Sequence, residues 1–155
     1  MTTAHAVPVT ETTIVHRGSI AAGVAGLFVV FAAFLPIASV LGFSVAGTDL
    51  RGWQGALLLF VEVLAVVTVG AAAATYTERM PLRPLAMITG VAGLVTTGAA
   101  IYAMIDIWSA PSASFMALTI AASPGVGLWV GLLAGIVMIG TGATLLRHHG
   151  DASAS

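Results

Sequence analysis

A single carboxyl group stands well inside one of the apolar runs of this chain. Glu62 lies in the run from about Gly55 to Thr75, some two helical turns from the end at which the run begins. Burying a charge at that depth in a membrane costs at least about 2.5 kcal/mol, so such a residue often marks function. Glu62 is therefore a candidate proton or cation site. The alternative, favoured because no other acid, Lys or His lies inside the apolar runs, is a carboxyl that only fixes helix packing.

Three further charged residues flank the apolar runs on one expected side. Asp49, Arg51 and Asp106 could together ligate a cation or bind a partner, because carboxylate oxygens are ligands for hard cations. The simpler interpretation is that Arg51 forms a salt bridge that pins one loop to another. Asp49 is equally suited to a turn, where its side chain accepts backbone N–H bonds.

Glycines form a stripe on the last apolar run. Gly127, Gly131 and Gly135 recur every four residues, a spacing that lets helix backbones approach closely. We expect helix packing there, within the chain or between two copies of it. The sequence contains no cysteine and no visible nucleophile–base pair, phosphate loop or pair of catalytic carboxylates. We therefore expect no enzyme activity, no cofactor and no metal site.

The composition indicates whether the chain is suited to water or to a lipid bilayer. Of the 155 residues, 59% are hydrophobic and only 7% are charged, whereas a soluble domain carries about 25% charge. The lipid bilayer is therefore the expected partner, and a formal net charge of −1 gives no footprint for nucleic acid. A span needs about 20 apolar residues, so the chain has room for four.

Apolar runs and turn residues predict an all-α membrane protein with a four-transmembrane-helix bundle. The transmembrane domain is expected over residues 18–147, between a disordered tail at 1–17 and a short tail at 148–155. Its spans are predicted at about 19–36, 55–76, 85–106 and 126–146, with outer segments at 37–53 and 107–125.

Arginine positions predict the orientation. Four arginines fall on one side of the four predicted spans and Arg51 alone on the other. Because Lys and Arg accumulate in cytoplasmic loops, both termini are expected in the cytoplasm. Trp53, Trp108 and Trp129 then lie near the outer interface, which indole rings prefer. They join Asp49, Arg51 and Asp106 as candidate extracytoplasmic interaction residues.

The chain also repeats itself. Gly23-Val-Ala-Gly-Leu27 recurs as Gly90-Val-Ala-Gly-Leu94, and the pattern Trp53-x-Gly-x-Leu57 recurs as Trp129-x-Gly-x-Leu133. These matches predict two parallel helical-hairpin repeats. The outer segments alternate in a period of two, which is typical of strands. We expect a small two-stranded antiparallel element in which about Val40–Ala46 pairs with about Phe115–Ala121.

One stretch carries a family resemblance. Phe34-Leu-Pro-Ile-Ala-Ser-Val-Leu-Gly-Phe-Ser-Val-Ala-Gly-Thr-Asp-Leu-Arg-Gly-Trp53, together with Gly125-Val-Gly-Leu-Trp129, resembles the uncharacterised small four-span membrane proteins common in actinobacteria. Members often carry Trp where this chain has Ile37. The resemblance implies a multi-pass protein of a bacterial plasma membrane and brings no activity, cofactor or site residues.

Two function classes follow from these features. The first is an accessory or scaffold subunit that binds other integral membrane or envelope proteins through its outer segments and helix faces; a homo-oligomer stays an open alternative. The second is an oligomeric ion channel or small transporter that uses Glu62. A transporter normally needs a path through the membrane that is lined by polar side chains. A single carboxyl group is weak support for such a path. The scaffold is therefore the preferred hypothesis.

Overall fold

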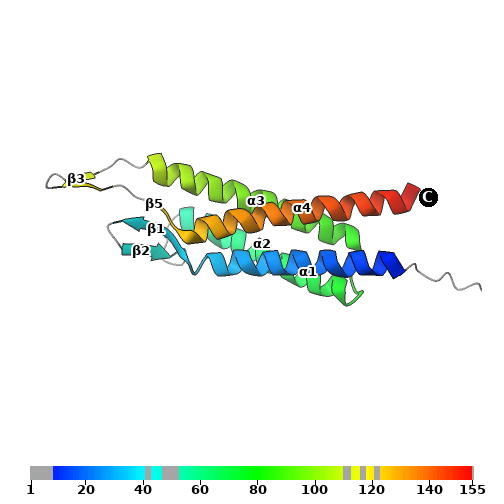
Figure 1. Cartoon of the computed structure of the whole chain (residues 1–155). Coiled ribbons are helices and arrows are strands. Elements are labelled where there is room, and N and C mark those ends of the chain that lie inside the picture. Colours follow the sequence, from blue (N-terminus) through cyan, green and yellow to red (C-terminus); the bar gives the residue numbers. More distant parts are fainter. Residues whose placement is uncertain are drawn as a thin grey trace, which may run out of the picture.

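Four long helices make up most of the described chain. The computed structural model describes residues 9–40, 43–46, 53–109, 113–115, 118–120 and 123–154. Within these ranges the helices are α1 (Val9–Ala32), α2 (Trp53–Tyr76), α3 (Leu82–Ser109) and α4 (Val126–Ala154). They lie side by side in an elongated bundle (Figure 1). The predicted four-helix bundle is confirmed.

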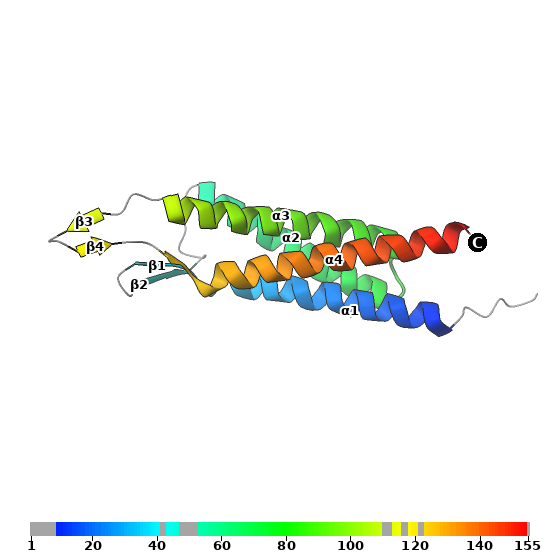
Figure 2. The same ribbon diagram turned by 45° about the horizontal axis from the view of Figure 1, so that its top comes forward.

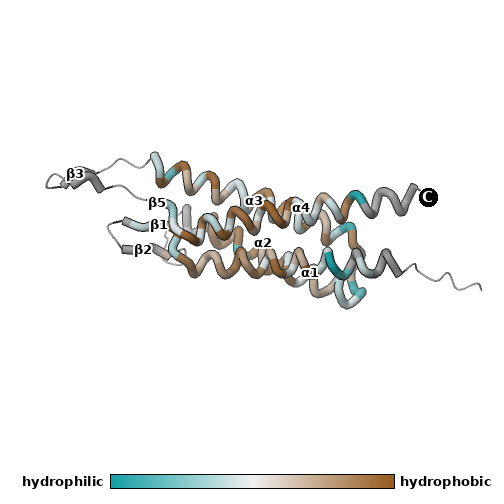
Figure 3. The backbone as a smooth tube through the Cα atoms, viewed as in Figure 1, coloured by the Kyte–Doolittle hydropathy of each residue, from teal (hydrophilic) through white to brown (hydrophobic). Residues whose placement is uncertain are grey.

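The two ends of the bundle differ in character. Figures 1 and 2 show every strand at one end, and the start of α1 and the C-terminal end of α4 at the other. The turn between α2 and α3 also lies at the end that carries the termini. In Figure 3, hydrophobic residues occupy the central parts of the helices, and hydrophilic residues gather near the α2–α3 turn. We call the two ends the strand end and the terminal end.

Side-chain size is distributed in an unusual way between the interior and the surface. The buried apolar residues are mostly alanines, such as Ala22, Ala65 and Ala92. Large apolar side chains such as Phe31 and Leu94 are more than half exposed, at 64% and 62%. Soluble domains bury their large apolar residues, whereas helices in membranes pack through small ones. The bundle follows the second pattern.

Three helices are long and apolar enough to cross a membrane. The qualifying segments in the described part of the chain are Gly55–Tyr76, Leu82–Ser109 and Val126–Arg147. The apolar part of α1, His16–Ala32, is shorter. It would extend about 25 Å at the α-helical rise of 1.5 Å per residue, slightly less than the roughly 30 Å of a bilayer core.

The strands form two small antiparallel sheets. The first has the order β2-β1-β5, built from β1 (Pro36–Val40), β2 (Phe43–Ala46) and β5 (Ser123–Pro124). The second pairs β3 (Ala113–Phe115) with β4 (Leu118–Ile120). Antiparallel strands in both outer segments are therefore confirmed.

The predicted partners of these strands are wrong. No pairing joins the described residues of Val40–Ala46 to those of Phe115–Ala121; instead β2 folds back on β1, and β4 folds back on β3. A hairpin closes a very short loop, so its entropy cost is lower than that of pairing two distant segments. The outer segments do meet across the chain, but through β1 and β5, where Ala38 pairs with Pro124 and Ser39 with Ser123.

Both predicted tails are partly helical. α1 begins at Val9, inside the segment 1–17 that was predicted as a disordered tail, and α4 continues to Ala154, beyond the predicted boundary at 147. Extending an existing helix costs much less than nucleating one, so polar flanks join the apolar helices. At the strand end α1 stops at Ala32 and not at 36, because Pro36 disfavours helical geometry in the residue before it.

The turn after α2 carries an unusual capping residue. Arg79 donates its N–H to the Ala74 carbonyl at 2.8 Å, and Glu78 donates to Thr75 at 3.0 Å. This is the Schellman arrangement, in which the left-handed position is usually glycine. Here it is Glu78, with a φ of 59°. The left-handed conformation costs an L-residue about 1–2 kcal/mol.

We expect Glu78→Gly to stabilise the chain by about 0.5 kcal/mol, because the strain that it relieves exceeds the extra chain entropy of glycine. Unfolding by SDS in mixed micelles measures the change. Glu78→Ala removes the same charge but keeps a Cβ, so its unfolding free energy should match that of the parent chain. If Glu78→Gly and Glu78→Ala stabilised the chain equally, the left-handed φ of Glu78 would not be the source of the strain.

Candidate functional site

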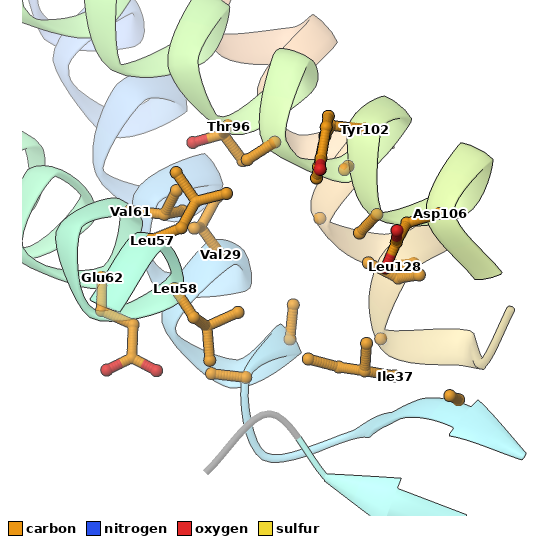
Figure 4. A pocket seen from close by; sticks show the side chains of 18 of the residues that line it. Val29, Ile37, Leu57, Leu58, Val61, Glu62, Thr96, Tyr102, Asp106 and Leu128 are labelled. Atoms are coloured by element: carbon orange, nitrogen blue, oxygen red, sulfur yellow. The ribbon is translucent and has the colours of Figure 1, made fainter. Parts of the chain in front are cut away.

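A cavity of about 260 Å³ lies at the strand end of the bundle. All four helices and β1 contribute to its wall, which is mostly aliphatic. In Figure 4, Leu57, Leu58 and Val61 of α2 lie on one side, and residues of α3 lie on the other. Ile37, at the start of β1, lies between the strands and the cavity. α2 and α3 contact each other less than the other neighbouring helices do, which leaves this space between them.

Two carboxylates line this cavity from different helices. Glu62 on α2 is half-buried, and Asp106 on α3 is exposed. They lie on opposite sides in Figure 4. At the α-helical rise, Glu62 stands about 14 Å from the start of α2, and Asp106 about 5 Å from the end of α3. Measured along the helices, Glu62 therefore lies about 9 Å farther from the strand end than Asp106.

Polar groups of α3 add to this lining. Tyr102 is 49% exposed and stands one helical turn before Asp106. Thr96 lies deeper, is only 4% exposed, and its Oγ1 has no hydrogen-bond partner among the described residues. A buried hydroxyl without a partner carries a desolvation cost of about 1–3 kcal/mol. The Thr96 hydroxyl therefore favours an occupant that can hydrogen-bond.

The other candidate interaction residues are only partly described. Asp49 and Arg51 lie outside the described residues. Trp53 is the first residue of α2, and its side chain is also outside them. Trp108 in the last turn of α3 and Trp129 in the first turn of α4 both stand at the strand end, 63% and 48% exposed.

The glycine stripe of α4 packs within the chain. A Cβ on Gly127 would lie 2.7 Å from the Ala32 carbonyl oxygen of α1, and one on Gly135 would lie 2.5 Å from Thr97 Oγ1 of α3. Gly131 is less crowded, since its nearest neighbour is the Ala32 Cβ at 3.9 Å. Gly127 and Gly131 also line the cavity. The stripe thus lets α4 approach both α1 and α3.

Sequence reasoning identified Glu62 and Asp106 separately and missed that they share one cavity. It also missed Tyr102 and Thr96. A signal was present: Thr96, Ala99 and Ala103 of α3 recur at helical spacing with Ala100 and Ile107. Up to Ile107, each turn of this face of α3 carries a small or polar residue. Such short side chains leave space between α3 and the neighbouring helices. Hydropathy alone does not detect such a face, because alanine and leucine are both apolar.

No site for a metal is apparent in the described part of the chain. It contains no group of three or more His, Asp or Glu side chains placed to hold an ion. Mg²⁺ and Ca²⁺ require about six or more oxygen ligands, and the cavity offers two carboxylates among aliphatic side chains. Two carboxylates supply at most four oxygen ligands, fewer than either ion requires.

Fold and site together define a class: a helical bundle with small residues inside, large apolar residues outside, and an acidic cavity beneath short strands. Comparison with protein-family models, curated proteins and solved structures finds no match for this chain. The resemblance to four-span actinobacterial proteins therefore stays a prediction from the motif at 34–53 and 125–129.

Proposed function

We propose that the chain is a multi-pass protein of a bacterial plasma membrane that serves as an accessory or scaffold subunit for other envelope proteins. The observation that carries this proposal is the open edge of β2 at the strand end. β2 pairs with β1 on one side, and no described residue pairs with its other side. A free strand edge presents unpaired N–H and C=O groups that an extended segment of a partner can join.

Placement in the bilayer is supported by the outer surface of the helices. Large apolar side chains are exposed on all four helices, including Phe28, Leu59, Val91 and Leu133. α1 completes a fourth span in this proposal, with Arg17 extending its side chain toward the headgroups. Arg79, Arg83 and Arg147 belong to the terminal end, which the positive-inside rule assigns to the cytoplasm.

An internal duplication is part of the same proposal and is supported by the hairpins. β1 ends at Val40 and β2 begins at Phe43, while β3 ends at Phe115 and β4 begins at Leu118. The segments 40–48 and 115–123 share a pattern of residue types when Val40 is aligned with Phe115. In this alignment the first residue of β2 corresponds to the first residue of β4. Gly26 and Gly93 are the fourth residues of the two repeated pentapeptides. Gly26 of α1 packs against α2, and Gly93 of α3 packs against α4, so each glycine contacts the second helix of its own repeat.

A site-specific cross-link tests the scaffold proposal. The chain contains no cysteine, so Ser44→Cys in β2 gives a unique position for a photoreactive maleimide. The matched control is Thr77→Cys, exposed at the opposite end of the bundle. In native membranes we expect Ser44→Cys to form one defined adduct with another envelope protein, and Thr77→Cys to form none.

Two outcomes would contradict the scaffold proposal. Identical adducts from both positions would mean that the strand end has no particular partner. An adduct of twice the mass of the chain would mean that β2 pairs with a second copy, which makes the assembly a homo-oligomer and removes the heterologous partner.

A further inference from the structure

Each of the four apolar helical segments has an arginine within three residues of the end that lies at the terminal end of the bundle. These residues are Arg17 for α1, Arg79 for α2, Arg83 for α3 and Arg147 for α4. All four side chains are exposed. We call these four residues the terminal arginines.

Contacts between the helices place the terminal arginines at a similar height. The ring of His16 on α1 meets the ring of Tyr76 on α2 edge-on, with 4.8 Å between the ring centroids. A Cβ on Gly18 of α1 would collide with the side chain of Leu145 on α4. Leu145 in turn shares one buried cluster with Leu85 of α3. Each terminal arginine is within three residues of one of these contacts, so all four lie within roughly one helical turn of each other along the bundle. Figure 3 shows hydrophilic residues of α1, of α4 and of the α2–α3 turn at this end.

The charge at this height is positive. Glu78, in the turn between α2 and α3, is the one carboxylate among the described side chains of the terminal end, and no ion pair joins a terminal arginine to another described residue. Glu11 and Asp151, whose side chains lie outside the described residues, occupy helical positions farther from the apolar segments. At the α-helical rise they stand about 9 Å beyond Arg17 and about 6 Å beyond Arg147. A phosphate group at the height of the terminal arginines therefore meets an excess of positive charge.

Exposed apolar side chains lie one turn deeper on the same helix faces. Ile20 follows Arg17 by three positions and is 53% exposed, and Met87 follows Arg83 by four positions and is 48% exposed. Residues three or four apart are neighbours on one face of a helix. A phospholipid has the matching order, with a phosphate at one end and apolar chains behind it. A free phosphate ester or an acidic peptide has no such chains.

We propose that the terminal arginines bind the phosphodiester headgroups of anionic phospholipids, whose acyl chains lie against the exposed apolar side chains beneath. Guanidinium groups pair with phosphate oxygens in a planar, bidentate geometry, and basic residues near an anionic lipid surface each add to the attraction. The proposal rests on the placement of the helices in a bilayer given above. It is independent of the free edge of β2, so a failure of the scaffold proposal would leave it unaffected.

The test compares two lipids with the same acyl chains. Native mass spectrometry of the chain in detergent measures the binding of phosphatidylglycerol and of phosphatidylcholine, whose phosphate is balanced by its own choline cation. One basic residue near an anionic lipid surface contributes a factor of about five, so we expect phosphatidylglycerol to bind at least about fivefold more tightly. Equal binding of the two lipids would overturn this proposal and leave the bilayer placement intact. Binding of neither lipid would contradict the bilayer placement as well.

Variants locate the preference. The quadruple variant Arg17→Gln/Arg79→Gln/Arg83→Gln/Arg147→Gln should bind the two lipids equally, with unchanged phosphatidylcholine binding as the sign of an intact fold. Lysine at the same four positions keeps the charge and should keep the preference. Glu78→Gln removes the opposing carboxylate and should tighten phosphatidylglycerol binding. A preference that survives in the glutamine variant would overturn the proposal.

Two controls separate this lipid site from other sources of the same attraction. Arg51→Gln removes an arginine that the sequence places between β2 and α2, and we expect the lipid preference to stay at the parent value. Loss of the preference in Arg51→Gln would assign the attraction to the overall charge of the chain. Glycerophosphoglycerol, the headgroup without acyl chains, should not displace phosphatidylglycerol at millimolar concentration. Displacement would make the terminal arginines a site for soluble phosphate esters and overturn the assignment to lipid.

Discussion

Replacing Gly93 by alanine should destabilise the bundle by about 2 kcal/mol. Gly93 lies on α3 where it meets α4, and a Cβ there would stand 2.7 Å from the Ile139 nitrogen and 2.8 Å from the Gly135 oxygen. Both atoms belong to the α4 backbone, which cannot move aside without separating the helices. This cost exceeds the gain of about 1 kcal/mol that alanine normally brings to a helix interior.

Gly98→Ala is the matched control for this prediction. It lies on the same helix, and nothing stands within 4 Å of its Cβ, so alanine should raise stability by up to about 1 kcal/mol. Unfolding free energies in mixed micelles compare the two variants. If Gly93→Ala proved as stable as Gly98→Ala, the close approach of α3 and α4 at this point would be wrong.

Gly125→Ala should cost about 3 kcal/mol, the upper part of the range for overpacking. Gly125 links β5 to α4 and donates its N–H to the Ile37 carbonyl at 2.6 Å. A Cβ at this position would collide with the Pro36 carbonyl group. The segment that leaves α1 and the segment that enters α4 would then have to separate.

Hydrogen exchange distinguishes this local effect from general destabilisation. In Gly125→Ala the amides of Gly125's neighbours in β1 and β5 should lose protection before those in the middle of α2. Ser39 and Ser123, whose hydroxyls lie 2.8 Å apart, report on the same junction. Gly140→Ala on α4, with nothing within 4 Å, is the control. Uniform loss of protection across the bundle in Gly125→Ala would contradict the local role of this glycine.

Much of the architecture follows from local sequence. Long apolar runs predict the helices, and the segment 76–84, with two prolines and two arginines, predicts the turn that separates α2 from α3. Alternation in the outer segments predicts the strands. These features depend on residues close together in the chain, where propensity and hydropathy act directly. The duplication and the orientation in the membrane stay predictions.

Strand partners and the cavity could not be predicted in the same way. Phe43 and Val45 alternate as a strand whether they pair with β1 or with a distant segment, so the pattern leaves the partner open. Glu62 and Asp106 lie on different helices, and only the rotation of α2 against α3 brings both to one wall. The rotation of α3 about its own axis depends on contacts such as that of Gly93 with Gly135 of α4, which hydropathy does not encode.

The sequence by itself determined the solvent for which the chain is suited, the number of helices and the positions of the turns. It also named Glu62 and Asp106 as residues of interest. Only the tertiary structure decided that β2 pairs with β1, that the glycines of α4 pack within the chain, and that the two carboxylates line one cavity. The physical reason is that both the interior and the surface of this bundle are apolar. Interior and surface differ in the size of their residues and in how closely the helix backbones approach. These properties take effect only once the helices pack together.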